Sequence, residues 1–144
     1  MCHMTRPRLL VWVFVWTVLT SCTSSELSVD KSSTFNTSVD DIAVTQVDVN
    51  DFTYNVRITG PVDGEVVILL HGFPQTSYEW RHQLRALGEA GFRAVAPDQR
   101  GYSPGARPPR VEDYKVTHLI EDVIGLADAI GADRFHIVGH DWGA

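Results

Sequence analysis

The sequence predicts an α/β fold in which helices flank a mostly parallel sheet. Three short, largely apolar runs, at residues 66–70, 93–96 and 135–138, have the character of strands buried on both faces. The segments between them carry apolar residues at helical spacing. Strands that alternate with helices in this way imply right-handed crossovers and a parallel sheet.

The start of the chain has the three parts of a signal peptide. Two arginines precede an apolar and aromatic stretch over residues 9–19, which is shorter than the ~20 residues that a transmembrane helix needs. Residues 19–22, Leu-Thr-Ser-Cys, resemble a bacterial lipobox, in which the cysteine is diacylated. We therefore expect a lipoprotein signal peptide over residues 1–21 and an exported protein anchored to the cell membrane through acyl chains on Cys22. Cleavage by an ordinary signal peptidase and an uncleaved anchor are the alternatives.

Composition and charge argue against nucleic acid as a partner. From Cys22 onward the chain carries ten basic and eighteen acidic residues, so its formal net charge is −8 and no basic patch could neutralise phosphates. The other cysteine, Cys2, lies in the segment that is expected to be removed, which leaves no disulfide framework. Residues 22–41 are rich in Ser, Thr and Asp and are expected to form a flexible linker before a domain over residues 42–144.

The domain is expected to begin with a β-hairpin. Residues 42–49 and 52–58 alternate apolar with polar side chains and are separated by Asn50 and Asp51. A turn over residues 60–64 follows, and it leads into the first buried strand. The hairpin therefore adds antiparallel pairing to the predicted sheet.

Two amphipathic helices are expected between the buried strands. Thr76 and Glu79 have the spacing of a capping box before the first helix, and Gly91 sits where a C-cap glycine belongs. The second helix is expected over about residues 117–130, with Gly131 ending it. The residues expected to face inward are Trp80, Leu84 and Leu87 on the first helix, and Leu119, Ile120, Val123, Ala127 and Ile130 on the second.

A polar, turn-rich segment follows each buried strand. Residues 71–74 are His-Gly-Phe-Pro, residues 97–103 are Pro-Asp-Gln-Arg-Gly-Tyr-Ser, and residues 139–143 are Gly-His-Asp-Trp-Gly. Catalytic groups of such folds gather at the carboxyl ends of the strands, where these three segments are expected to meet. A plain connecting loop is the alternative for the first segment. For the second, the preferred interpretation is a structural ion pair between Asp98 and Arg100.

Asp141 occupies the position that serine holds in a G-x-S-x-G nucleophile elbow. Gly139 and Gly143 flank it, as expected where a Cβ would collide with neighbouring backbone. A carboxylate, with a reference pKa of ~3.9, is ionised at neutral pH and can attack without a base. It suits displacement at a saturated carbon, such as that of an epoxide or an alkyl halide, better than attack on an ester carbonyl. An ordinary Gly-x-Asp-x-Gly turn is the alternative.

Taken together, the three segments resemble the N-terminal half of an α/β-hydrolase, and more narrowly the epoxide hydrolase and haloalkane dehalogenase branch. The resemblance implies that Asp141 is the nucleophile and that the backbone amides of Phe73 and Trp142 form the oxyanion hole. It also implies an alkyl-enzyme ester that water, activated by a histidine, hydrolyses, with no metal and no cofactor. The substrate would be a small apolar electrophile. The motif residues with a structural role would be His71, Gly72, Pro74, Gly139 and Gly143.

The choice between epoxide and halide depends on the residues beside the nucleophile. Dehalogenases of this branch usually hold the halide with the indole that follows the nucleophile and with a polar residue after His-Gly. This chain has Trp142, but Phe73 replaces the polar residue. An epoxide hydrolase-like activity is therefore favoured, and a haloalkane dehalogenase-like hydrolase is the alternative.

The resemblance places the catalytic acid, the histidine and the substrate lid after the nucleophile in chain order, beyond residue 144. His71 is expected to be a structural turn residue, and His140 is expected to point away from the elbow. We therefore expect a truncated product that cannot turn over substrate, although Asp141 could still be alkylated once. A lipid-anchored, non-catalytic binding protein that keeps this half-fold is the alternative from another class.

Overall fold

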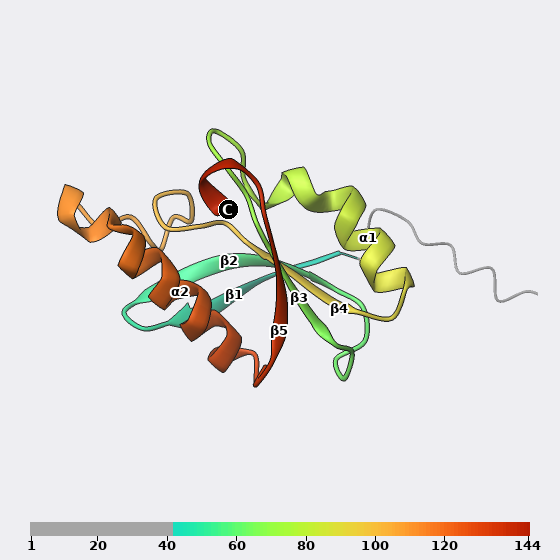
Figure 1. Ribbon diagram of the computed structural model, residues 1–144. Helices are drawn as coiled ribbons and strands as arrows, with labels where there is room; N and C mark the ends of the chain where they lie inside the picture. Colours follow the sequence, from blue (N-terminus) through green and yellow to red (C-terminus); the bar gives the residue numbers. More distant parts are fainter. Residues whose placement is uncertain (1–41) are drawn as a thin grey trace, which may run out of the picture. The chain divides into compact units, whose positions relative to one another are not determined.

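The computed structural model describes residues 42–144, in which five strands form one sheet in the order β1-β2-β4-β3-β5 (Figure 1). The signal peptide, Cys22 and the linker predicted above lie outside the described residues. The strands are β1 (Ala43–Val49), β2 (Phe52–Thr59), β3 (Val66–Leu70), β4 (Arg93–Pro97) and β5 (Phe135–Gly139), and the helices are α1 (Arg81–Glu89) and α2 (Val116–Ala129). Three short 3₁₀ turns lie at Ser77–Trp80, Val111–Tyr114 and Asp141–Gly143.

The predicted hairpin is confirmed at the β1 edge of the sheet. β1 pairs antiparallel with β2, with Ala43 opposite Ile58 and Val49 opposite Phe52. Asn50 turns the chain with a φ of +53°, a conformation that asparagine tolerates better than most residues. β2 then pairs antiparallel with β4 and joins the hairpin to the rest of the sheet.

The predicted parallel strands are also confirmed. β3 pairs in parallel with β4 on one side and with β5 on the other. The carboxyl ends of these three adjacent strands therefore lie on the same side of the molecule, and the three turn-rich segments begin there.

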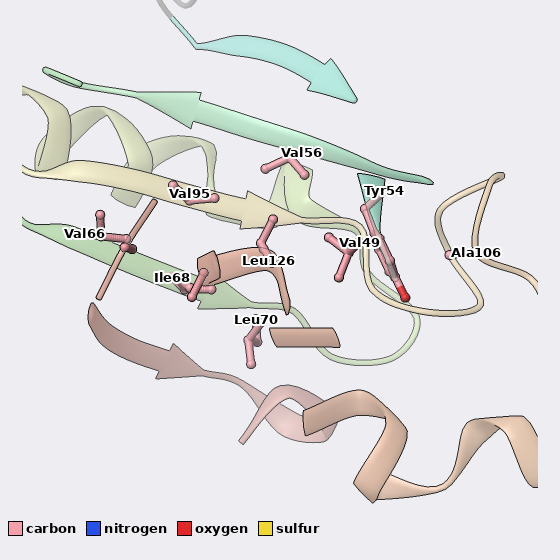
Figure 2. Close-up of a cluster of buried hydrophobic side chains, with 11 residues drawn as sticks. Val49, Tyr54, Val56, Val66, Ile68, Leu70, Val95, Ala106 and Leu126 are labelled. Carbon is pink, nitrogen blue, oxygen red and sulfur yellow. The ribbon is translucent and has the colours of Figure 1, made fainter. Parts of the chain in front are cut away.

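Alternate residues of β3 build two cores, one on each face of the sheet. Val66, Ile68 and Leu70 pack with residues of α2 such as Leu126, in the cluster drawn in Figure 2. The intervening residues of β3 pack in the second cluster with Trp80 and with Leu84 of α1. The two helices accordingly cover opposite faces (Figure 1), which explains why every residue of β3 is buried.

Helix α1 ends as predicted, whereas its start differs from a capping box. Gly91 has a φ of +88°, and the N–H of Phe92 reaches back to the carbonyl of Leu87 as in a Schellman motif. At the start, the Thr76 hydroxyl accepts from the Tyr78 N–H at 3.4 Å, and the chain forms a 3₁₀ turn before α1. The Glu79 carboxylate lies 3.6 Å from a ring nitrogen of His140, so the reciprocal half of the predicted box is wrong.

Helix α2 lies one residue earlier than expected, and one of its expected core residues is exposed. Leu119 and Val123 are partly buried and Ala127 is buried, as predicted, but Ile120 is 53 % exposed. Ile120 lines an apolar groove between α2 and β5, because in the described residues the sheet ends at β5 and nothing covers that side of the helix. Periodicity marks the apolar stripe of a helix but does not say how much of the stripe a neighbour covers. Within residues 42–144, no helix has the length and apolarity that crossing a membrane requires.

Candidate active site

The three turn-rich segments meet at the carboxyl ends of β3, β4 and β5, as predicted. The loop that starts with His71 follows β3, the loop that starts with Asp98 follows β4, and His140 and Asp141 follow β5. Because β3 lies between the other two strands, its loop can contact both neighbours. It does so through Phe73 on one side and through His71 on the other.

Asp141 is the first residue of the 3₁₀ turn that follows β5, and only His140 lies between it and the strand. Its φ is +53°, in the left-handed region that costs a non-glycine residue free energy. A Cβ on Gly139 would come 2.2 Å from the carbonyl oxygen of Gly143, and a Cβ on Gly143 would come 2.3 Å from that of Leu70. Both flanking glycines are therefore required by close backbone contacts, as a nucleophile elbow would require.

Gly72 is also required by its distance from Asp141. A Cβ at position 72 would come 2.5 Å from the Asp141 Cβ and 2.7 Å from its Oδ1. The absence of a side chain lets the His-Gly-Phe-Pro turn approach the aspartate. As a result the Phe73 N–H donates a hydrogen bond to Asp141 Oδ1 at 2.9 Å.

The exposed Asp141 carboxylate is stabilised in its charged form. The hydrogen bond from the Phe73 amide, and next the hydrogen bond from the Trp142 amide, hold the pKa of Asp141 below its ordinary value. The nearby His140 ring lowers this pKa further. The two amides predicted to form the oxyanion hole thus both donate to the carboxylate of Asp141. The catalytic role of Asp141 stays a prediction.

His71 is buried and has a structural place in the turn. Its Nε2 lies 2.9 Å from the Gln99 N–H, its Nδ1 lies 2.9 Å from the Gly72 carbonyl oxygen, and its ring meets the ring of Tyr102 edge-on at 4.6 Å. The Gln99 side chain donates to the His71 carbonyl. The turn closes where the Gln75 N–H donates to the Gly72 carbonyl, after a cis peptide bond between Phe73 and Pro74.

Neither histidine near the elbow is placed as a base. The ring nitrogens of His71 contact the Gly72 carbonyl and the Gln99 N–H. The His140 ring is directed to Glu79. Among residues 42–144, no imidazole hydrogen-bonds to the carboxylate of Asp141. These contacts favour a structural role for His71, and the roles of both histidines stay predictions.

The ion pair predicted between Asp98 and Arg100 is wrong. Asp98 Oδ1 accepts from the Ser77 N–H at 2.9 Å, and it thereby fixes the start of the turn before α1. Arg100 instead makes two short hydrogen bonds with Asp122 of α2, from Nε to Oδ2 at 2.7 Å and from Nη2 to Oδ1 at 2.6 Å. Neighbours in sequence suggested one partner, whereas the true partner comes from a helix 22 residues further along the chain.

Comparison with known proteins agrees with this geometry. The family model described as the alpha/beta hydrolase fold matches residues 65–144. The chain belongs to the α/β-hydrolase fold family.

Among α/β-hydrolase relatives, epoxide hydrolase A of Mycobacterium tuberculosis is 49 % identical over 98 residues, which are 68 % of this chain and 30 % of that protein. The AB hydrolase superfamily protein YfhM of Bacillus subtilis is 40 % identical over 97 residues, 67 % of this chain and 34 % of the relative. The crystal structure of epoxide hydrolase VrEH1 from Vigna radiata matches with a TM-score of 0.70 and 42 % identity, over 74 % of this chain and 34 % of that one. The chain spans about a third of the length of these relatives.

A cavity of about 310 Å³ opens beside the hydrolase elbow, and sequence reasoning missed several residues of its wall. Its lining includes Phe73 and Trp142, whose amides meet Asp141. The lining residues that had not been predicted are Gln99, Arg100, Tyr102, Tyr114 and Leu119. Gln99, Arg100 and Tyr102 lie in the segment after β4, whose motif was recognised without a place for these side chains in a cavity wall. Among the described residues, no group of three or more histidine, cysteine or acidic side chains is placed to hold a metal ion.

Proposed function

We propose that this chain carries the nucleophilic half of an epoxide hydrolase-like site, with Asp141 as the nucleophile. The observation that carries the proposal is the Asp141 carboxylate on a strained turn, with Oδ1 held by the Phe73 amide. Its lowered pKa keeps it charged at neutral pH, so that it can attack without a base. The similarity to named epoxide hydrolases supports the choice of electrophile.

In the first step, a carboxylate oxygen of Asp141 bonds to one epoxide carbon and the bond from that carbon to the epoxide oxygen breaks. Because Oδ1 is held by the Phe73 amide, we assign the attack to Oδ2. The released alkoxide takes a proton from water, and the product is a 2-hydroxyalkyl ester of Asp141. The whole mass of the epoxide is thereby added to the chain.

In the second step, water adds to the ester carbonyl carbon and negative charge develops on Oδ1. The bond between that carbon and Oδ2 then breaks, so the diol leaves with Oδ2 and takes a proton, and the Asp141 carboxylate keeps the oxygen of the water. We assign the stabilisation of this charge to the amides of Phe73 and Trp142, as donors of an oxyanion hole, and the support is that both donate to the Asp141 carboxylate. This step needs a base, and neither His71 nor His140 is in position to act as one. We therefore propose that the 144-residue polypeptide on its own is alkylated once and releases the product slowly.

The cavity beside the elbow favours a small apolar substrate. Its wall is formed largely by Phe73, Tyr102, Tyr114, Leu119 and Trp142, which offer aromatic and aliphatic surface. Transfer of apolar surface from water into such a cavity is favourable. An aryl or alkyl epoxide of a few carbon atoms is the substrate class that this wall suits.

One observation favours a second candidate, a haloalkane dehalogenase-like hydrolase. Trp142 is 76 % exposed next to Asp141, so its indole is free to meet a halide, whereas Phe73 offers no side-chain donor as a partner. Intact mass spectrometry of the chain with an epoxide and with the alkyl bromide of the same carbon skeleton separates the two. We expect the epoxide to add its full mass faster than the bromide adds its alkyl group. A faster reaction with the bromide would contradict the choice of epoxide.

We also propose that the protein is exported and anchored through acylated Cys22. The support is the sequence of residues 19–22 after an apolar stretch. Growth with a radiolabelled fatty acid should label the wild-type protein and leave Cys22→Ala unlabelled. Equal labelling of the two proteins would overturn the anchor.

A further inference from the structure

The peptide group between Gly72 and Phe73 is held at both of its polar ends. Its N–H donates to Asp141 Oδ1 at 2.9 Å. Its carbonyl oxygen lies 2.9 Å from His71 Nδ1 and accepts from the Gln75 N–H at 3.1 Å. The buried imidazole and the exposed aspartate therefore contact opposite ends of one peptide dipole.

The surrounding hydrogen bonds determine which ring nitrogen of His71 carries the proton. The Gln99 N–H can only donate, so His71 Nε2, 2.9 Å away, has to accept. The proton of the neutral ring is then on Nδ1, which donates to the Gly72 carbonyl. The Tyr102 ring packs edge-on against the imidazole and helps to keep it in this orientation.

We propose that His71 is a positioning residue that strengthens the Phe73 N–H as a donor to Asp141 by hydrogen-bonding the carbonyl of the same peptide. A donor on the carbonyl polarises the peptide and makes its N–H a better donor, because hydrogen bonds in a chain reinforce one another. It also fixes the plane of the peptide, and with it the direction of the N–H. The importance of this effect for catalysis rests on the proposed role of Asp141.

The inference makes a prediction about the pKa of Asp141. Loss of the His71 hydrogen bond weakens the Phe73 donor, which stabilises the charged carboxylate, so the pKa of Asp141 should rise toward its ordinary value. The other groups that act on this carboxylate are the Trp142 amide and the His140 ring, which is paired with Glu79. His71→Phe replaces neither of these two groups.

The test compares His71→Asn, which keeps an N–H donor near the position of Nδ1, with His71→Phe, which keeps ring volume without a donor. Titration followed by the Phe73 amide proton and the Asp141 carboxyl carbon in NMR reports the pKa directly. We expect His71→Asn to titrate near the wild type and His71→Phe to titrate roughly 0.3 to 1 unit higher. An unchanged pKa in folded His71→Phe would overturn the inference.

A measurement on the wild-type chain keeps the inference testable if a variant fails to fold. The ¹⁵N chemical shifts of the His71 ring distinguish the two tautomers, and we expect protonation on Nδ1. Protonation on Nε2 would overturn the inference. These readouts need no substrate, so the lack of an adduct on Asp141 would count against the proposed function alone.

Discussion

Asp141 is held at a φ of +53° by contacts that lie outside the residue itself. Gly143 rests against the carbonyl of Leu70 at the end of β3, and Gly139 rests against Gly143. A strained backbone conformation persists only where the surrounding structure holds it in place, and here the close backbone contacts of Gly139 and Gly143 do so. The same contacts bring the carboxylate to the Phe73 amide.

Gly143→Ala should therefore destabilise the chain by about 2–4 kcal/mol, because the new Cβ would lie 2.3 Å from the Leu70 carbonyl oxygen. Gly131→Ala is the matched control. Gly131 has a φ of +74° with open space around the position of a Cβ, so only backbone strain of about 1 kcal/mol is expected. Urea unfolding measures both changes, and equal losses would show that the close contacts are not what demands glycine at the elbow.

At the residue scale the sequence predicts the close contacts at Gly139 and Gly143, because an elbow leaves no room for a Cβ at either position. The resemblance to the hydrolase branch also singled out the amides of Phe73 and Trp142, which both donate to Asp141. Their role as an oxyanion hole stays a prediction. The partner of Arg100 was not predictable in this way, because Asp122 shares no local pattern with it. The pairing depends on how α2 packs, which is a property of the tertiary structure.

At the scale of elements, the Arg100–Asp122 ion pair links the loop after β4 to helix α2. Both side chains are nearly inaccessible, and Arg100 also lies over the Phe52 ring and donates to the Asp113 carbonyl. The pKa of the neighbouring Tyr54 hydroxyl is raised mainly by burial and then by the Asp122 carboxylate, so this hydroxyl stays neutral beside the pair. Gln99, the residue before Arg100 in the same loop, donates its backbone N–H to His71.

Removing one partner of such a pair leaves a buried charge without compensation. Asp122→Asn should therefore lower the free energy of unfolding by about 3 kcal/mol. Asp113→Asn is the matched control, because it makes the same chemical change in the exposed pair with Arg110 and should leave the urea midpoint unchanged. Similar midpoints for the two variants would contradict the structural role of the buried pair.

At the scale of the whole described domain, several exposed apolar side chains lie on β5 and on the neighbouring face of α2. Ile137 and Val138 of β5 are 56 % and 41 % exposed, and they lie at an edge of the sheet in residues 42–144. Ile120 and Ile124 of α2 continue this surface across a groove of about 420 Å³. Exposed apolar edges of this kind promote association between chains.

Ile137→Lys should reduce self-association of the 144-residue polypeptide, because a charge on an edge strand disfavours pairing with another chain. Sedimentation over a range of protein concentrations measures the change. The control is Val62→Lys, which adds the same charge at an exposed residue in the turn before β3. Equal association of both variants would show that the β5 edge is not the contact surface.

The order of elements and the parallel centre of the sheet were predictable, since each depends on local periodicity and on general rules of connection. The extent of burial on α2 was not, because it depends on which neighbour covers the helix. Ile120 shows this most clearly, as it fits the helical pattern and yet lies in the open groove. The wall of the cavity beside Asp141 was not predicted either, because its residues come from loops and a helix that only the tertiary structure brings together.

The central claim is that Asp141 is a nucleophile toward an epoxide carbon, and the position of a covalent adduct tests it most directly. The 144-residue chain is incubated at neutral pH with a small aryl epoxide, and tandem mass spectrometry of its peptides locates the added mass. We predict one epoxide per chain on the carboxyl group of Asp141 and no adduct on Asp141→Asn. An adduct at another residue, equal modification of the two proteins, or no adduct at all would contradict the claim.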